Sequence, residues 1–147
     1  MSSMFPRESR SMSVIIVAQA VVVHGLEQAT MALAEALPVT LLSAPGAGAY
    51  AGAGWWRAMI ATARAVHPAT PCQDVLDCGN APGRAMAAIR AGQTILVLDP
   101  ACPAFARVAM LAAVLPRRPP ALDLAERGAE RRLRAWLSHR PDDGPLG

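Results

Sequence analysis

Five short apolar runs, separated by segments of helix length, constrain the fold of this 147-residue chain more than any other feature. Apolarity is continuous along a run such as residues 94–99, as is typical of a strand covered on both faces. The runs predict strands at residues 13–18, 39–43, 74–78, 94–99 and 121–124. Helical spacing of the apolar residues between them predicts helices at residues 24–37, 55–66, 81–91, 103–115 and 129–139.

Alternation of strands and helices indicates an α/β protein with a mainly parallel sheet and right-handed crossovers. We expect a three-layer sandwich with five strands in the flavodoxin-like order 2-1-3-4-5. The alternative is a partial β/α barrel in the order 1-2-3-4-5, which would need a second chain to close. The run at 121–124 follows a proline-rich stretch and is expected to be an edge strand.

The chain is expected to form one domain over residues 13–138, after a disordered leader at residues 1–12 and before a flexible tail at residues 139–147. Arg7 and Arg10 precede an apolar run, as in a secretory signal, but that run is short and also fits a first strand. Three cysteines, an odd number, favour a reducing cytoplasm over a disulfide framework. No apolar run has the length of about 18 residues that a membrane span requires.

Residues 43–56, SAPGAGAYAGAGWW, form a glycine-rich segment between a predicted strand and a predicted helix. A Walker A motif needs a lysine, and the chain has none. A dinucleotide fingerprint needs an acidic residue about 20 positions later, yet no Asp or Glu lies between Glu35 and Asp74. Two interpretations remain open: a flexible connector, or a site where glycine amides and a helix amino end hold a small anion.

The anion hypothesis places the ligand between this segment and the junction at residues 77–80, at the carboxyl edge of the sheet. Of two adjacent tryptophans, one is expected to cover the segment, because neighbouring side chains on a helix point about 100° apart. The predicted ligand-binding residues are Ser43, Gly46, Gly48, Gly52, Gly54, Trp55, Arg57 and Asn80.

Asp77, Asp99 and Cys102 are the candidate catalytic residues, because each follows a predicted strand at that same edge. Two carboxylates there could share a proton or a hard cation, and a thiol at a helix amino end can become nucleophilic. Aspartate at such junctions more often caps a helix or forms a turn, and a small thiol is more often buried. The cysteine spacing predicts no metal site, and the sequence identifies no cofactor.

Residues 117–140, towards the carboxy terminus, contain half of the 14 basic residues, all of which are arginines. The predicted helix in this segment could meet phosphates, but the net charge is only +3 and no nucleic-acid-binding motif is present. We therefore favour a module that binds a small anionic ligand or a protein partner, including a second copy of itself. A small enzyme of the lyase or hydrolase type is the alternative, and a nucleic-acid-associated protein is the second alternative.

Overall fold

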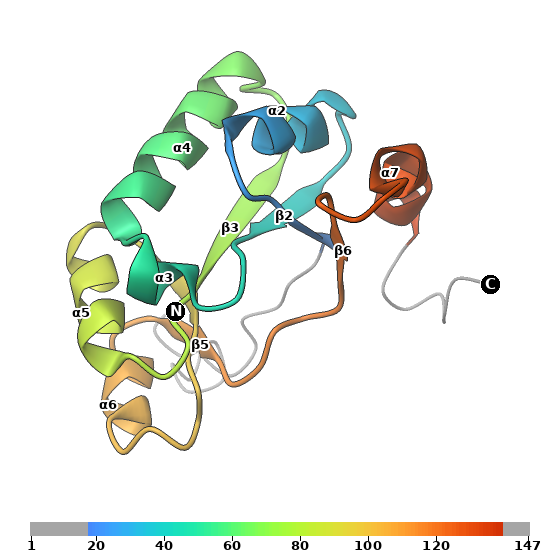
Figure 1. Ribbon diagram of the computed structural model, residues 1–147. Helices are drawn as coiled ribbons and strands as arrows, with labels where there is room; N and C mark the ends of the chain where they lie inside the picture. The colour runs from blue at the N-terminus through green and yellow to red at the C-terminus, as the bar shows by residue number, and fades with distance from the viewer. Residues whose placement is uncertain (1–17, 140–147) are drawn as a thin grey trace, which may run out of the picture.

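The computed structural model describes residues 18–139 as an α/β fold built on a parallel sheet (Figure 1). The leader at residues 1–12 and the tail beyond residue 139 lie outside the described residues. The described elements, in chain order, are β1 (Ala20–Val22), α2 (Leu26–Ala34), β2 (Val39–Leu42), α3 (Ala47–Tyr50), α4 (Ala53–Val66), β3 (Cys72–Asp77), α5 (Pro82–Arg90), β4 (Ile95–Val97), α6 (Phe105–Ala109), β5 (Ala113–Leu115), β6 (Ala121–Asp123) and α7 (Ala129–Ser138).

The α/β class and the parallel sheet predicted from the sequence are confirmed, and the described sheet has six strands in the order β5-β4-β3-β2-β1-β6. Every pair is parallel. The observed order differs from 2-1-3-4-5 at one point: β2, rather than β1, pairs with β3. The first five strands thus follow the sequential order of the alternative, because each crossover moves one strand further in the same direction.

Two predicted elements differ more from the structure than a shift of a few residues at their ends. The predicted strand at 13–18 lies outside the described residues except for Ala18, and the observed β1 begins at Ala20. The predicted helix at 103–115 ends early, because α6 stops at Ala109 and the chain then forms β5, which pairs with β4. Leu115 fits a helical apolar face and a strand equally well, so periodicity could not separate the two. The run at 121–124 is an edge strand, β6, as expected, but it pairs with β1, whereas both predicted orders placed it beside the strand at 94–99.

The larger core lies on one face of the sheet. Strand residues such as Leu41 and Leu76 meet buried side chains of α4, among them Trp56 and Ile60. The helices α2, α5, α6 and α7 also bury side chains in this cluster. Because β1 to β5 follow one another in order across the sheet, crossovers of one hand deliver α2, α4, α5 and α6 to the same face.

The opposite face carries a smaller cluster made of alternate strand residues. Its buried members are Val22, Leu42, Val75, Ile95 and Val97. The β5–β6 connection crosses on this side of the sheet, away from α2 and α4 (Figure 1). Six residue steps reach at most about 22 Å, whereas six flat strands would separate β5 from β6 by about 24 Å. The sheet must therefore twist or curl so that its two edges approach one another.

Candidate functional site

The glycine-rich segment folds into a short helix and two left-handed turns rather than an open loop. Gly46 precedes α3 with φ +70°, and Gly52 precedes α4 with φ +89°. Residues with a Cβ rarely adopt these angles, so the backbone requires glycine at both positions. Gly54 lies in the first turn of α4 with open space around it.

Gly48 is buried and packs directly on the carboxyl end of β3. A Cβ at this position would lie 2.8 Å from Cys78 Sγ and 3.1 Å from the carbonyl oxygen of Asp77. Gly79 approaches Gly46 closely as well, since a Cβ on Gly79 would lie 3.7 Å from the Gly46 Cα. The segment and the 77–80 junction thus meet as expected, but the contact between them is filled by the protein's own atoms. Asn80 lies exposed at the start of the turn into α5.

The Ser43 side chain contacts the same junction from the end of β2. Its hydroxyl is buried, accepts a hydrogen bond from the Asp77 backbone N–H at 2.9 Å and donates to the Ala44 carbonyl at 3.1 Å. The hydroxyl therefore links the ends of β2 and β3, which is a structural role.

The two tryptophans divide as predicted, with Trp56 fully buried and Trp55 39% exposed. Their rings lie 5.9 Å apart between centroids. Trp56 Nε1 donates to Asp74 Oδ2 at 3.0 Å, on the helix-covered face of the sheet. Trp55 remains at the surface, at the amino end of α4.

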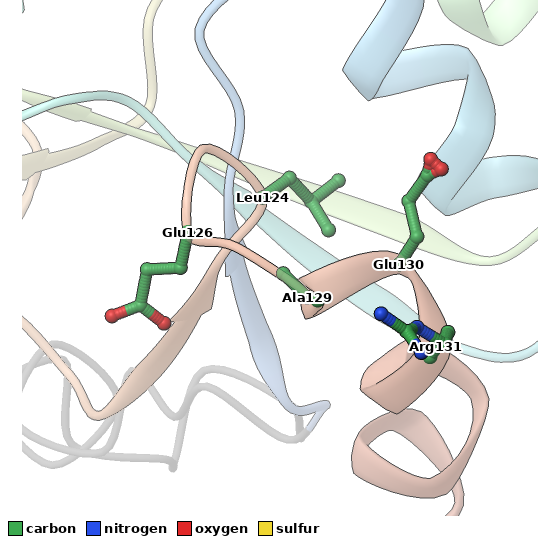
Figure 2. A pocket seen from close by; sticks show the side chains of 6 residues that line it. Leu124, Glu126, Ala129, Glu130 and Arg131 are labelled. Carbon is green, nitrogen blue, oxygen red and sulfur yellow. The ribbon is translucent and has the colours of Figure 1, made fainter.

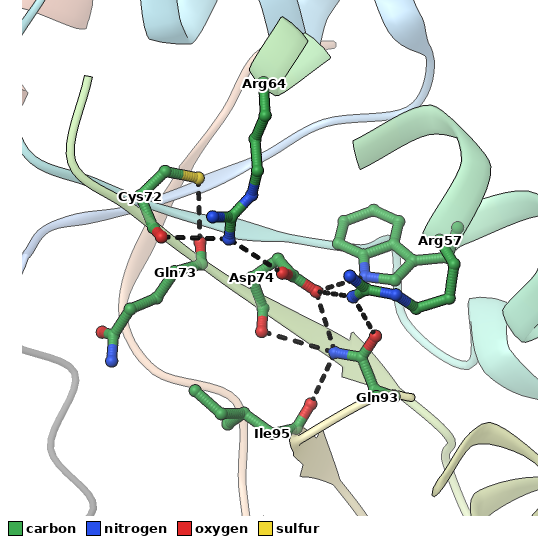
Figure 3. Close-up of polar contacts among 8 residues, drawn as sticks. Arg57, Arg64, Cys72, Gln73, Asp74, Gln93 and Ile95 are labelled. Atoms are coloured by element: carbon green, nitrogen blue, oxygen red, sulfur yellow. Dashed lines mark hydrogen bonds and ion pairs between the residues drawn. The ribbon is translucent and has the colours of Figure 1, made fainter. Parts of the chain in front are cut away.

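The Arg57 side chain reaches into a polar cluster around Asp74 (Figure 3). Its guanidinium donates to Asp74 Oδ2 and to Gln93 Oε1, both at 2.8 Å. Arg64 reaches Asp74 Oδ1 at 3.3 Å, and Gln93 Nε2 reaches Asp74 Oδ2 at 2.9 Å. Because Asp74 is 7% exposed, this arrangement compensates a buried carboxylate with two cations and neutral donors.

Asp77 and Asp99 come to neighbouring strand ends, as their positions predicted. The Asp99 backbone N–H donates to the Gly79 carbonyl at 2.8 Å. Each carboxylate then accepts a hydrogen bond from the backbone N–H two residues later, at Gly79 and Ala101 respectively. Such local bonds are the turn-forming role of aspartate.

Asp77 has a second partner that the sequence did not indicate. Arg118, in the β5–β6 connection, places Nη1 2.7 Å from Asp77 Oδ2. The carboxylate side chain is 6% exposed and the arginine side chain 27%. Both Asp77 oxygens are thus engaged by the protein itself.

The three cysteines are free thiols. Burial raises the pKa of Cys78 to about 11, and the nearby Asp77 carboxylate acts in the same direction. Burial likewise raises the pKa of Cys72 to about 11, with Arg64 opposing the shift. Both thiols are therefore protonated at neutral pH, the opposite of an activated nucleophile. Cys102 lies half-buried in the turn before α6.

One polar pair at the carboxyl edge was missed by sequence reasoning. His24 Nε2 lies 2.7 Å from Asp123 Oδ1, joining the ends of β1 and β6, and both side chains are 35% exposed. Asp123 Oδ1 also accepts the Ala125 backbone N–H at 2.9 Å. The sequence did place both residues at strand ends, since His24 follows the first strand and Asp123 lies in the run at 121–124. Predicting their contact, however, required knowing that β6 lies beside β1.

A hollow of about 310 Å³ follows β6, at the amino end of α7. Its lining residues are Leu124, Glu126, Gly128, Ala129, Glu130 and Arg131 (Figure 2). Figure 2 shows the Glu126 and Glu130 side chains pointing away from each other. Glu126 forms an exposed ion pair with Arg132 at 3.5 Å. These charged groups do not converge on one point, so the hollow lacks the arrangement of a catalytic centre.

Comparison with protein-family models and with curated proteins gives no match for this chain. Within residues 18–139, no group of three or more His, Cys, Asp or Glu side chains is placed to hold a metal ion. No helix in that same range combines the length and the apolarity needed to cross a bilayer.

Proposed function

We propose that this protein is a non-catalytic α/β binding module that uses the carboxyl edge of its sheet to hold a protein partner. One observation carries the proposal. Leu26, Tyr50 and Trp55 are 43%, 72% and 39% exposed, and all three lie at this edge. They belong to the amino end of α2, the carboxyl end of α3 and the amino end of α4, which follow β1 and β2.

Exposed aromatic side chains are enriched in protein interfaces, where tyrosine and tryptophan are frequent anchors. Two of the three candidate catalytic residues at the same edge, Asp77 and Asp99, are engaged in turns. Ser43, Asp77 and Asp99 hold turns and strand ends together by the hydrogen bonds described above. With Ser43, Asp77 and Asp99 engaged in this way, the three exposed apolar side chains favour binding over chemistry at this edge.

The small-anion alternative receives less support from the same geometry. Arg57, the cation expected to assist the anion, is paired with Asp74, and Gly48 packs against Cys78. The three unpaired cysteines agree with the reducing cytoplasm that we infer as the compartment.

To test the proposal, three forms of the purified protein are immobilised, and the proteins that each form captures are compared. These are the wild type, an edge variant (Leu26→Ser, Tyr50→Ser, Trp55→Ser) and a control variant (Met110→Ser, Leu111→Ser). The control changes exposed apolar residues, 83% and 55% exposed, in the turn after α6. We expect a stoichiometric partner to bind the wild type and the control but not the edge variant, with the purified partner giving the same result by calorimetry.

Equal capture of the partner by all three forms would contradict the proposal. Self-association is examined by sedimentation of the wild type over a range of concentrations. If inorganic phosphate or nucleotides raise the melting temperature of all three forms instead, the anion alternative replaces the partner.

A further inference from the structure

The helices α4, α5 and α6 lie next to one another on one face of the sheet and carry basic but no acidic side chains. Each contacts the next, and Figure 1 shows the three along one side of the molecule. Of the 11 acidic residues in the chain, none lies in these helices. Their five arginines, which we call the arginine face, are Arg57 and Arg64 on α4, Arg84 and Arg90 on α5, and Arg107 on α6.

Most of the positive charge on the arginine face is not neutralised by the protein itself. The three arginines of α5 and α6 are exposed, and in the described part of the chain their side chains form no ion pair and no hydrogen bond. Arg57 and Arg64 share the single carboxylate of Asp74, and their side chains remain 31% and 45% exposed. Five guanidinium groups therefore meet one buried carboxylate, and the surplus charge is open to solvent.

Helix stability alone does not account for this separation of charge. Arg64, Arg90 and Arg107 lie in the last turns of their helices, where a cation interacts favourably with the helix dipole. The same dipole favours aspartate or glutamate in the first turn, yet α4, α5 and α6 have neither there. In contrast, α2 and α7 each have a glutamate in the first turn. The three adjacent helices thus present one sign of charge where stability would favour both.

The outer surface of α4 around its arginines is apolar. Ala58, Ala61, Ala65 and Val66 are exposed, the last of them by 57%. The only hydroxyl of the helix, on Thr62, donates to the Ala58 carbonyl at 2.9 Å. Arginine is enriched in protein interfaces and acidic residues are depleted there, whereas interfaces with nucleic acid are more polar. The composition of this surface therefore favours a protein partner over a nucleic acid.

We propose that the arginine face binds an acidic, amphipathic helical segment of a partner protein, at a site separate from the carboxyl edge of the sheet. Arg57 and Arg64 are seven positions apart, which places them about 10 Å apart along α4. Arg84 and Arg90 are separated by about 9 Å along α5. Glutamates two turns apart on a partner helix match both spacings, and the apolar side of that helix covers the alanines of α4. Complementary charge selects an acidic segment and excludes a basic one.

Peptide binding to the full-length protein tests this proposal. The probe is a fluorescein-labelled synthetic helical peptide with glutamates at positions i, i+3 and i+7 and leucines on its other side, followed by fluorescence anisotropy. The face variant Arg84→Glu/Arg90→Glu reverses two charges without breaking a described contact. The control Arg127→Glu/Arg131→Glu makes the same change in net charge at exposed arginines outside the face, which form no ion pair in the described part of the chain.

We expect the wild type and the control to bind the peptide with similar affinity, and the face variant to bind it at least about tenfold more weakly. A peptide with glutamine in place of glutamate should lose affinity for the wild type to a similar extent. Both variants should melt within about 2 °C of the wild type, because the exchanged side chains are exposed.

Equal weakening in the face variant and the control would mean that only net charge matters, and would overturn the proposal. No binding to the wild type, or tighter binding of a single-stranded oligonucleotide of equal charge, would overturn it as well. The edge variant (Leu26→Ser, Tyr50→Ser, Trp55→Ser) should bind the peptide as the wild type does, which separates this surface from the carboxyl edge. Loss of the peptide by the edge variant but not by the face variant would assign the acidic segment to that edge and contradict the proposal.

Discussion

Arg118 Nη1 lies 2.7 Å from Asp77 Oδ2, so an ion pair fastens the β5–β6 connection to the carboxyl end of β3. The two residues are 41 positions apart in the chain. Asp77 alternates with Leu76 along β3, so this contact lies on the sheet face that carries Val75 and Val97. It is therefore a direct restraint on how the last strand returns to the far edge.

Arg118→Gln should lower the free energy of unfolding by about 2 kcal/mol, the usual size for a charge-assisted hydrogen bond to a largely buried carboxylate. The measurement is urea denaturation followed by circular dichroism. Arg117→Gln is the control, because Arg117 is the exposed neighbour on the same connection. Equal loss in the two variants would mean that the ion pair contributes nothing beyond general charge.

Gly48→Ala should destabilise the fold by about 1–3 kcal/mol, because the new methyl group would overlap Cys78 Sγ and press on the β3 backbone. Gly54→Ala is a matched control in the same segment, where an added Cβ meets nothing within 4 Å. It should be neutral or stabilising by about 0.5–1 kcal/mol, since alanine favours the helix. Thermal unfolding of both variants checks the pair, and an unaffected Gly48→Ala would show that α3 is not packed on β3.

Asp74→Leu should cost about 3–5 kcal/mol, because it leaves the Arg57 and Gln93 side chains and the Trp56 N–H without their shared acceptor. Chemical denaturation monitored by tryptophan fluorescence also reports on the environment of Trp56. Glu126→Gln breaks an ion pair whose side chains are more than half exposed, and should cost less than about 1 kcal/mol. Similar losses from both substitutions would contradict the structural role of the Asp74 cluster.

Stability should fall between about pH 9 and pH 11, where the partly buried thiol of Cys72 and the buried thiol of Cys78 titrate. Their pKa values are raised from 9.0 to about 11, so the folded state holds its protons longer than the unfolded state. The resulting contribution is fully present below pH 9 and is lost as the pH rises through 11. Because the chain has no lysine, no lysine side chain titrates in this pH range.

The measurement is the free energy of unfolding from pH 8 to pH 11 for the wild type and for Cys72→Ala/Cys78→Ala. The variant should show a smaller decline. An identical decline would mean that the thiols do not titrate differently in the two states.

Much of the fold could be predicted from the sequence, because continuous apolar runs and helical spacing are local signals. β2, β3 and β4 lie within or close to the predicted runs, and α4 contains the predicted helix. Strand order could not be predicted in the same way. Whether β1 or β2 lies beside β3 depends on which edge each crossover reaches, and both choices bury the same apolar residues.

The candidate site, too, could be predicted only in part from the sequence. The position of Asp77 and Asp99 at adjacent strand ends followed from topology, but their turn-forming hydrogen bonds are matters of backbone geometry. Arg118 gave no local sign of its partner, since Asp77 is distant in the chain. The His24–Asp123 pair was hidden for a similar reason, because it depends on β6 returning to the edge beside β1.

That return has a consequence during protein synthesis. Ala20 pairs with Ala121, so β1 has an open hydrogen-bonding edge until β6 has left the ribosome. An unpaired strand edge is a template for pairing with other chains. Sheet assembly from β1 to β5 can proceed in step with translation, whereas closure by β6 is the last event. Premature termination before residue 121 would therefore release a chain with β1 unprotected, prone to aggregate rather than to fold.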